Sequence, residues 1–311
     1  MMRVLVTGAS GFIGQYCIAL LSGRGSDVHA VGRQPPQNST NVIWHAVDLV
    51  APGAVSRLVE EVKPTHLLHL AWYTVPKKYW SAPENLEWVA ASLLLAREFA
   101  RHGGKRAIFA GTCAEYEWVE GRYSEYVTPC RPTSFFGLCK HGLHTLVDRF
   151  ATEAGLSHAW ARIFFLYGPH EHPARLVAAA TRSLLVGEHA QCSPGLHSRD
   201  FLHVEDAARA LVALLKSEVI GPVNIASGQP VAIREIAAKI GDILGCRDRV
   251  DFGALPAPSN EPLVMYADTA RLAREVGWNP VYTLDFGLRH TVEWWKNSLK
   301  REDGIKTEEA L

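Results

Sequence analysis

The sequence predicts an α/β protein, built on a doubly wound parallel sheet with a smaller C-terminal α/β substrate lobe. Through the first half of the chain, short apolar segments of strand length alternate with longer segments that have the apolar period of amphipathic helices. Beyond about residue 166 this alternation ends, and loops rich in Pro, Gly and His separate the helical segments. A βαβα alternation is typical of a parallel sheet with helices on both faces, because right-handed crossovers place them there.

The individual elements follow in order along the chain. Strands are predicted at 3–7, 28–31, 42–47, 66–70, 106–111 and 159–165. Helices are predicted at 12–23, 53–63, 84–102 and 132–155, and in the second half at 205–216, 232–245 and 285–300. We therefore expect a first domain over residues 1–165 and mainly a substrate lobe over residues 166–311. Part of that lobe, at about 204–227, is expected to return to the first domain.

Composition excludes several classes of partner. Thirty-two basic residues balance thirty-two acidic ones, so no field of one sign is available to hold nucleic acid or an anionic membrane. No apolar run approaches the roughly 18 residues of a membrane span, and no secretory leader fits before Gly8. The six cysteines show no paired or metal-ligand spacing, which is typical of reduced thiols. We expect a cytoplasmic protein with no nucleic-acid or membrane partner and no metal site.

A glycine-rich loop follows the first strand and opens the first helix. Gly8 permits a tight turn, Gly11 lets the backbone approach a pyrophosphate, and Gly14 lets the helix pack closely on the strand. Phe12 and Ile13 complete the loop, and the helix N-terminus behind it favours phosphate charge. In this strand–loop–helix context the motif predicts a Rossmann dinucleotide site.

The ends of the next three strands predict the rest of the cofactor site. A carboxylate after the second strand would select NAD by accepting from the ribose 2′-hydroxyl, but this chain has Arg33 there. A guanidinium can pair with a 2′-phosphate, so NADP(H) is predicted, with NAD(H) left open. Asp48 and Leu49 are placed to receive adenine, while Leu70 and Ala71 are placed to line the pyrophosphate and ribose.

These segments and several later motifs together resemble the extended short-chain dehydrogenase/reductase family. The motifs occur in one order and span nearly the whole chain: TGASGFIG at 7–14, DL at 48–49, HLA at 69–71, GTCAEY at 111–116, FGLCK at 136–140, RIFFLYGP at 162–169, SRDFLHVED at 198–206 and NIASG at 224–228. Most members of that family act on nucleoside-diphosphate sugars as reductases, epimerases or dehydratases.

The resemblance implies a catalytic set with one departure. Thr112 would hydrogen-bond the reacting sugar oxygen, and Lys140 would hold the nicotinamide ribose and lower the pKa of a nearby phenol. The phenol is expected four residues before the lysine, one helical turn away, where this chain has Phe136. Phenylalanine has no proton to transfer, so either a tyrosine has been replaced in this chain or another group donates. Three other phenols lack the required spacing: Tyr116, Tyr123 and Tyr126.

The residues after Thr112 separate the reactions of the family. Its dehydratases carry Asp-Glu where this chain has Cys113 and Ala114, so elimination is disfavoured. Epimerisation beside a ketone would need an added base, for which Cys113 and His170 are candidates. Reduction needs the fewest groups and suits NADP(H). We therefore expect reduction of the C4 ketone of a nucleoside-diphosphate-4-keto-6-deoxysugar, with a 4-epimerase or a catalytically impaired cofactor-binding homologue as alternatives.

The substrate contacts and the assembly are also implied by the resemblance. Thr112 and Cys113 would face the sugar, and Arg199 resembles the family's diphosphate clamp. Phe165 occupies the position that usually carries an asparagine for the same diphosphate, so a changed pocket is expected. The helices predicted at 84–102 and 132–155 would pair across a homodimer as a four-helix bundle.

Overall fold

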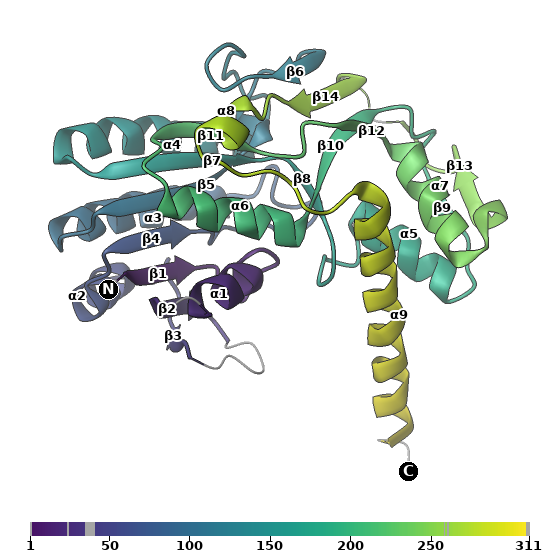
Figure 1. The fold of residues 1–311 in the computed structure, drawn as a ribbon, viewed down its shortest axis with the longest axis horizontal. Helices are drawn as coiled ribbons and strands as arrows, with labels where there is room; N and C mark the ends of the chain where they lie inside the picture. Colours follow the sequence, from purple (N-terminus) through teal and green to yellow (C-terminus); the bar gives the residue numbers. More distant parts are fainter. Residues whose placement is uncertain (1, 24, 35–40, 258, 260, 309–311) are drawn as a thin grey trace.

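A seven-stranded parallel sheet lies at the centre of the computed structural model (Figure 1). The structure describes residues 2–23, 25–34, 41–257, 259 and 261–308, with side chains up to Arg301. The spatial order of the strands is β3-β2-β1-β4-β5-β7-β11. Their bounds are β1 (Arg3–Thr7), β2 (Asp27–Gly32), β3 (Ile43–Ala46), β4 (His66–His69), β5 (Arg106–Thr112), β7 (Ser157–Ile163) and β11 (Gly221–Ile225). The predicted doubly wound parallel sheet is thereby confirmed.

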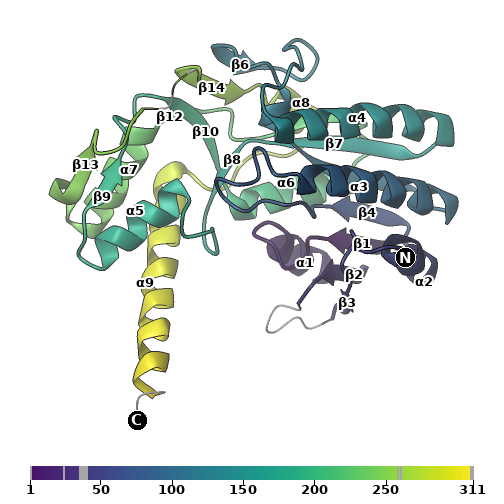
Figure 2. The ribbon, with the colours of Figure 1, turned by 180° about the vertical axis from the view of Figure 1, so that it is seen from behind.

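Helices cover both faces of this sheet, as Figures 1 and 2 show from opposite sides. Helices α1 (Gly14–Ser22) and α6 (Val204–Lys216) cover one face, while α2 (Ala54–Val62), α3 (Glu84–Arg101) and α4 (Phe135–Ala154) cover the other. Side chains alternate along a strand, so Val4 and Val6 of β1 join the α1–α6 core whereas Leu5 joins the opposite core. Among the described residues, no helix is long and apolar enough to cross a membrane.

The second lobe is a smaller α/β unit beside the carboxyl ends of the large sheet (Figure 1). Its main sheet has the order β12-β10-β14-β6, with β8 paired to β10, and a separate pair joins β13 to β9. The strands are β6 (Gly121–Tyr123), β8 (Phe165–Tyr167), β9 (Ala190–Cys192), β10 (Ser198–His203), β12 (Pro230–Ala232), β13 (Val250–Phe252) and β14 (Val264–Ala267). Helices α5 (Leu176–Leu185), α7 (Ile233–Leu244) and α9 (Leu284–Glu308) form its core, and α8 (Ala270–Arg274) packs beside β11.

One predicted strand is wrong in extent. The apolar segment 159–165 forms two strands, because the chain leaves the large sheet after Ile163 and enters the second lobe at Phe165. Phe164, between them, donates its N–H to the Ile225 carbonyl at 3.1 Å and buries its ring against Tyr116 and Tyr123. The run of apolar residues continues across this change of sheet, so hydropathy alone did not reveal it.

The carboxyl ends of the strands of the large sheet lie beside the second lobe. The strand order reverses between β1 and β4, and ligands of doubly wound folds bind outside the carboxyl ends of the strands at this switch point. The glycine loop follows β1, Leu70 follows β4 and Cys113 follows β5, so three predicted segments meet at this edge.

Candidate active site

The glycine loop has the close packing that its sequence predicts. Gly8 has φ of 69°, and a Cβ there would lie 2.7 Å from the Ala71 nitrogen. A Cβ on Gly14 would collide with the Gly8 carbonyl oxygen, and one on Gly11 would lie 3.0 Å from the same atom. Larger residues would therefore push the loop away from the ends of β1 and β4, where a pyrophosphate would lie.

The end of β2 lies against the glycine loop. A Cβ on Gly32 would come within 2.9 Å of the Ser10 hydroxyl oxygen, so the backbone before Arg33 is in contact with the loop. The Arg33 side chain is exposed. The guanidinium is therefore accessible to a ligand where an adenosine ribose would lie.

Asp48 and Leu49, which are predicted to receive adenine, both make structural contacts. Asp48 Oδ1 accepts a hydrogen bond from the Val50 N–H at 3.2 Å, so its carboxylate caps a turn. Leu49 is buried in the core beneath α2 and α3. Their contact with adenine stays a prediction.

A buried hydrogen-bond chain fixes the end of β4. The Thr7 hydroxyl lies 2.6 Å from His69 Nδ1, and His69 Nε2 lies 2.8 Å from the Ser92 hydroxyl of α3. Burial lowers the pKa of His69 to about 3, so the imidazole is neutral. The Ala71 N–H donates to the same Thr7 hydroxyl at 3.3 Å, which holds the backbone at Leu70 and Ala71 against β1.

Thr112 begins a short 3-10 turn at the end of β5. Its Oγ1 accepts from the Ala114 N–H at 3.2 Å, and the Glu115 carboxylate accepts from the Thr112 N–H at 2.8 Å. Glu115 also accepts from Arg162 Nε at 3.1 Å and from the Trp160 indole. This capping box fixes the backbone at the end of β5.

Lys140 lies on the same face of α4 as Phe136, and both side chains are buried. The helix begins after Ser134, whose hydroxyl accepts from the Gly137 N–H at 3.0 Å. Lys140 Nζ donates to the Ala110 carbonyl at 2.8 Å and lies 3.6 Å from the centre of a Trp72 ring. Burial lowers the pKa of Lys140 to about 7. Near neutral pH, Lys140 can therefore gain or lose a proton.

Phe136 lies among aromatic rings from the loop that follows β4. Its ring meets the Tyr79 ring edge to face at 5.0 Å between centres, and the Trp80 ring at 5.9 Å. Phe136 N–H donates to the Trp80 carbonyl at 3.1 Å. The aromatic stretch after β4 therefore covers the start of α4.

The two candidates for an added base, Cys113 and His170, lie in different surroundings. Burial raises the pKa of the Cys113 thiol to about 12, so the thiol keeps its proton at neutral pH. His170 has φ of 67°, and its ring packs on Trp294 at 4.4 Å and on Tyr16 at 6.3 Å between ring centres. In the described part of the chain, neither His170 nor His172 belongs to a group of three side chains close enough to share a metal ion.

Arg199 and Phe165 lie together in the second lobe, with the guanidinium 5.9 Å from the ring centre. The Arg199 side chain is buried and forms an ion pair with Glu261 at 2.7 Å. It also donates to the Pro262 carbonyl at 2.9 Å. A diphosphate would compete with Glu261 for this arginine, so the predicted clamp stays a prediction.

Of the three phenols considered as alternatives to a tyrosine at position 136, two form hydrogen bonds within the protein and one is exposed. Tyr116 donates its hydroxyl to Asn224 Oδ1 at 2.8 Å, and Tyr123 donates to the Val119 carbonyl at 2.5 Å. Tyr126 is 70% exposed. Their interpretation as packing or loop aromatics fits these contacts.

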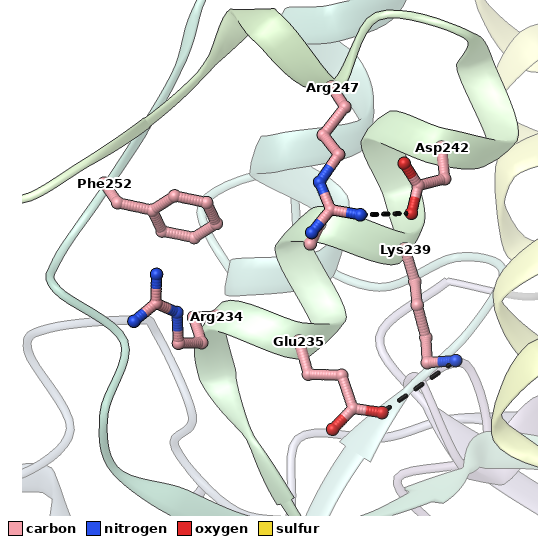
Figure 3. Close-up of a pocket in the computed structure, with 7 residues that line it drawn as sticks. Arg234, Glu235, Lys239, Asp242, Arg247 and Phe252 are labelled. Atoms are coloured by element: carbon pink, nitrogen blue, oxygen red, sulfur yellow. Dashed lines mark hydrogen bonds and ion pairs between the residues drawn. The ribbon is translucent and has the colours of Figure 1, made fainter.

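A hollow of about 370 Å³ lies on α7, far along the chain from these residues, and Figure 3 shows the side chains that line it. Charged side chains line it, and two ion pairs are formed there: Arg247 with Asp242 at 2.9 Å and Lys239 with Glu235 at 3.8 Å. None of the residues that line it belongs to the predicted site. Lys239 also pairs with Asp285 at 2.8 Å, and Arg234 packs on the Phe252 ring, so the charged groups of the hollow have structural partners.

Sequence reasoning missed two residues that contact the aromatic loop after β4, Asn85 and Arg175. Asn85 of α3 accepts from Trp72 Nε1 at 2.8 Å and donates to the Tyr79 carbonyl at 2.8 Å. Arg175, just before α5, places its guanidinium 5.5 Å from the Tyr79 ring centre. The many aromatic residues after β4 indicated that this loop packs on the protein. Residue spacing could not predict which side chains it contacts, because the loop has no regular structure.

Comparison with known proteins identifies the family. Residues 4–226 match the profile of the NAD-dependent epimerase/dehydratase family. The chain is 28% identical over 315 residues to UDP-glucuronic acid decarboxylase 1 of Xenopus tropicalis, covering 96% of this chain and 73% of that protein. The crystal structure of UDP-glucose 4-epimerase from Thermus thermophilus in complex with NAD is similar, with 26% identity, a TM-score of 0.85, and 96% and 100% of the two chains covered.

A further solved structure, MoeE5 in complex with UDP-glucose and NAD, is 29% identical, with a TM-score of 0.85 and coverage of 96% and 99%. These similarities extend over both lobes, as does the sequence resemblance to the extended short-chain dehydrogenases. The chain belongs to the NAD-dependent epimerase/dehydratase family, whose members are nucleotide-sugar enzymes of the extended short-chain dehydrogenase type.

Proposed function

We propose that this chain reduces the C4 ketone of a nucleoside-diphosphate-4-keto-6-deoxysugar with NADPH. The observation that carries the proposal is the pair of Thr112 and Lys140 at the switch-point edge, with Cys113 and Ala114 in place of an acid pair. Thr112 offers a hydroxyl proton to a carbonyl oxygen, and Lys140 lies across the same edge on α4. A bound nicotinamide supplies hydride, and the residues of this chain orient the ketone and stabilise its oxygen.

The acid and base groups present favour reduction over elimination and over epimerisation beside a ketone. Elimination of water needs carboxyl groups beside the sugar, and Cys113 and Ala114 supply none. Epimerisation beside a ketone needs a base, and Cys113 keeps its proton because burial raises its pKa to about 12. Reduction needs only hydride, one proton and a polarised carbonyl.

The experiment that tests this function compares the chain with its Phe136→Tyr form. Each receives NADPH and a panel of nucleoside-diphosphate-4-keto-6-deoxysugars, and nicotinamide absorbance is followed. Oxidation of NADPH with a member of the panel supports the reductase. If neither form oxidises NADPH with any of these sugars, the proposal is wrong, and a 4-epimerase or an impaired cofactor-binding homologue takes its place.

A 4-epimerase is the second candidate, since Thermus thermophilus UDP-glucose 4-epimerase is 26% identical over nearly the whole chain. Such an enzyme returns the hydride to the sugar, so it consumes no cofactor overall. Interconversion of two nucleoside-diphosphate hexoses without net NADPH oxidation would identify it.

We propose NADP(H) as the cofactor, with Arg33 as the residue that selects it. Arg33→Ala is expected to weaken NADPH binding about 10- to 100-fold, the loss of one or two charge-assisted hydrogen bonds to the 2′-phosphate. NADH lacks that phosphate and serves as the matched ligand, because its affinity should change less than about twofold. Nicotinamide fluorescence titration measures both constants. Equal weakening of both cofactors, or tighter NADH than NADPH in the unchanged chain, would contradict the selection.

We propose a homodimer formed by α3 and α4. An apolar hollow of about 290 Å³ lies between these helices, lined by Leu93, Ala96, Arg97, Leu146, Val147 and Phe150. Leu146 is 55% exposed there. Leu146→Glu would bury a carboxylate in such an interface, and light scattering is expected to show the monomer mass. Leu196→Glu, at a 59% exposed position of the second lobe, is the control that should stay dimeric. A dimer that survives Leu146→Glu places the interface elsewhere.

A further inference from the structure

The loop that follows β4 places one phenol directly against the phenylalanine that interrupts the catalytic set. The Tyr79 and Phe136 rings meet at 83° with 5.0 Å between their centres. Tyr79 also stacks on Trp80 at 4.6 Å, and its side chain is largely buried. Tyr79 therefore brings a phenol into contact with Phe136, the position four residues before Lys140.

Backbone and side-chain contacts hold Tyr79 in place. Its N–H donates to the Val75 carbonyl at 3.1 Å, and its carbonyl accepts from Asn85 Nδ2 at 2.8 Å. Asn85 also accepts from the Trp72 indole, whose ring lies under the Lys140 ammonium. On the other side, the hydrogen bond from Phe136 N–H to the Trp80 carbonyl ties the loop to α4. Tyr79 is therefore fixed relative to both Phe136 and Lys140.

The charges around the Tyr79 hydroxyl come from both lobes. The Arg175 guanidinium lies 5.5 Å from the ring centre. Cys113 from the first domain and Glu261 from the second lobe lie within electrostatic range of the same group. Burial raises the pKa of the Tyr79 phenol, and Arg175 acts against that rise. The hydroxyl thus keeps its proton at neutral pH and has a cation beside it to stabilise a phenolate.

A buried carboxyl group lies within electrostatic range of Arg175. Glu171 is 6% exposed, and Arg175 is the charged group that most affects it. Burial raises the pKa of Glu171 to about 8, and Arg175 opposes that rise.

We propose that Tyr79 donates the proton that Phe136 cannot, acting as the general acid toward the C4 oxygen of the sugar. This inference rests on the proposed reductase function and adds to it the identity of the proton donor. The carbonyl carbon gains hydride, with its electron pair, from the reduced nicotinamide that the proposed function supplies. The carbonyl oxygen forms an O–H bond with the Tyr79 proton, as the phenol O–H bond breaks. Arg175 stabilises the phenolate, which then takes a proton from water, so one hydride and one proton are consumed per ketone.

The test uses the full-length chain in four forms: unchanged, Tyr79→Phe, Phe136→Tyr, and the double variant. Tyr79→Phe keeps the ring and its packing, so a fall in kcat of about 10²- to 10⁴-fold is expected, the usual contribution of a general acid. The dissociation constants of NADPH and the nucleotide sugar, measured by fluorescence, should change less than about twofold, because the phenol acts on the transition state. The double variant should recover activity, since it restores a phenol one turn before Lys140. Tyr126→Phe, at an exposed position, is the matched control with unchanged kcat.

The outcomes separate this inference from the function on which it rests. A Tyr79→Phe form with kcat within about twofold of the unchanged chain would overturn the role of Tyr79 while leaving the reductase intact. The same conclusion follows if the unchanged chain is inactive and Phe136→Tyr alone is active. A Tyr79→Phe form that loses activity together with nucleotide-sugar binding, and that Phe136→Tyr does not rescue, assigns Tyr79 a structural role. If no form oxidises NADPH, the reductase and its donor are rejected together.

Discussion

Replacing Lys140 with methionine is expected to remove nearly all activity and at the same time stabilise the cofactor-free protein. Activity is expected to fall at least about 10²-fold, because the ammonium proposed to hold the nicotinamide ribose is lost. Methionine has a similar length and fills the same buried space over the Trp72 ring. Steady-state NADPH oxidation measures the first effect, and urea unfolding measures the second.

The expected stability gain follows from the pKa of Lys140, which burial lowers from 10.5 to about 7. Between these two pH values the unfolded chain binds more protons than the folded protein, so the free energy of unfolding rises with pH across this window. The lysine therefore costs most stability at pH 7 and below. Methionine removes that cost, and we expect a gain of about 1–3 kcal/mol at pH 7 that shrinks as the pH rises.

Lys140→Arg is the matched variant, because arginine keeps the charge at all these pH values. It should be less stable than the unchanged chain, with no recovery at high pH. A Lys140→Met protein that is less stable than the unchanged chain at pH 7 would show that the hydrogen bond to the Ala110 carbonyl outweighs the burial of the charge.

Thr112→Val should lower kcat about 10²- to 10³-fold, the usual effect of removing one hydrogen-bond donor from a developing oxyanion. Valine has the shape of threonine but no hydroxyl. It also removes the acceptor of the Ala114 N–H, so a stability loss of about 1 kcal/mol is expected from the capping box.

Thr112→Ser keeps both the hydroxyl and the capping hydrogen bond, and it should retain most of the activity and stability. Single-turnover kinetics with saturating NADPH separate the chemical step from binding. If Thr112→Val and Thr112→Ser had the same kcat, the hydroxyl would not act on the substrate, and its role would be that of a cap alone.

Much of the first domain could be predicted from the sequence, because its signals are local. The glycine loop is recognised from its spacing after a strand, and the steric need at Gly14 comes from Gly8 and Ala9 in the same loop, although the need at Gly8 comes from Ala71 at the end of β4. Lys140 and Phe136 were placed on one face by helical spacing alone. The strand order of a βαβ unit is likewise constrained by its right-handed crossover.

The second lobe and the final shape of the site could not be predicted in the same way. Its strands are short, and β10 pairs with β8, β12 and β14 from distant parts of the chain. Glu261 lies 62 residues from Arg199 in the sequence, so neighbouring residues could not predict that the two side chains form an ion pair. Tyr79 meets Phe136 through a loop whose path depends on Asn85, a contact that periodicity does not encode.

The most direct test of the reductase is the fate of the hydride. The unchanged chain and Phe136→Tyr would each be incubated with NADPH carrying deuterium at the transferable position and a nucleoside-diphosphate-4-keto-6-deoxysugar, with the product examined by NMR. The account predicts one deuterium at C4 of the sugar for each NADP⁺ formed, with a single configuration at that carbon. Two C4 epimers formed without net NADP⁺, or deuterium retained by the cofactor, would contradict it.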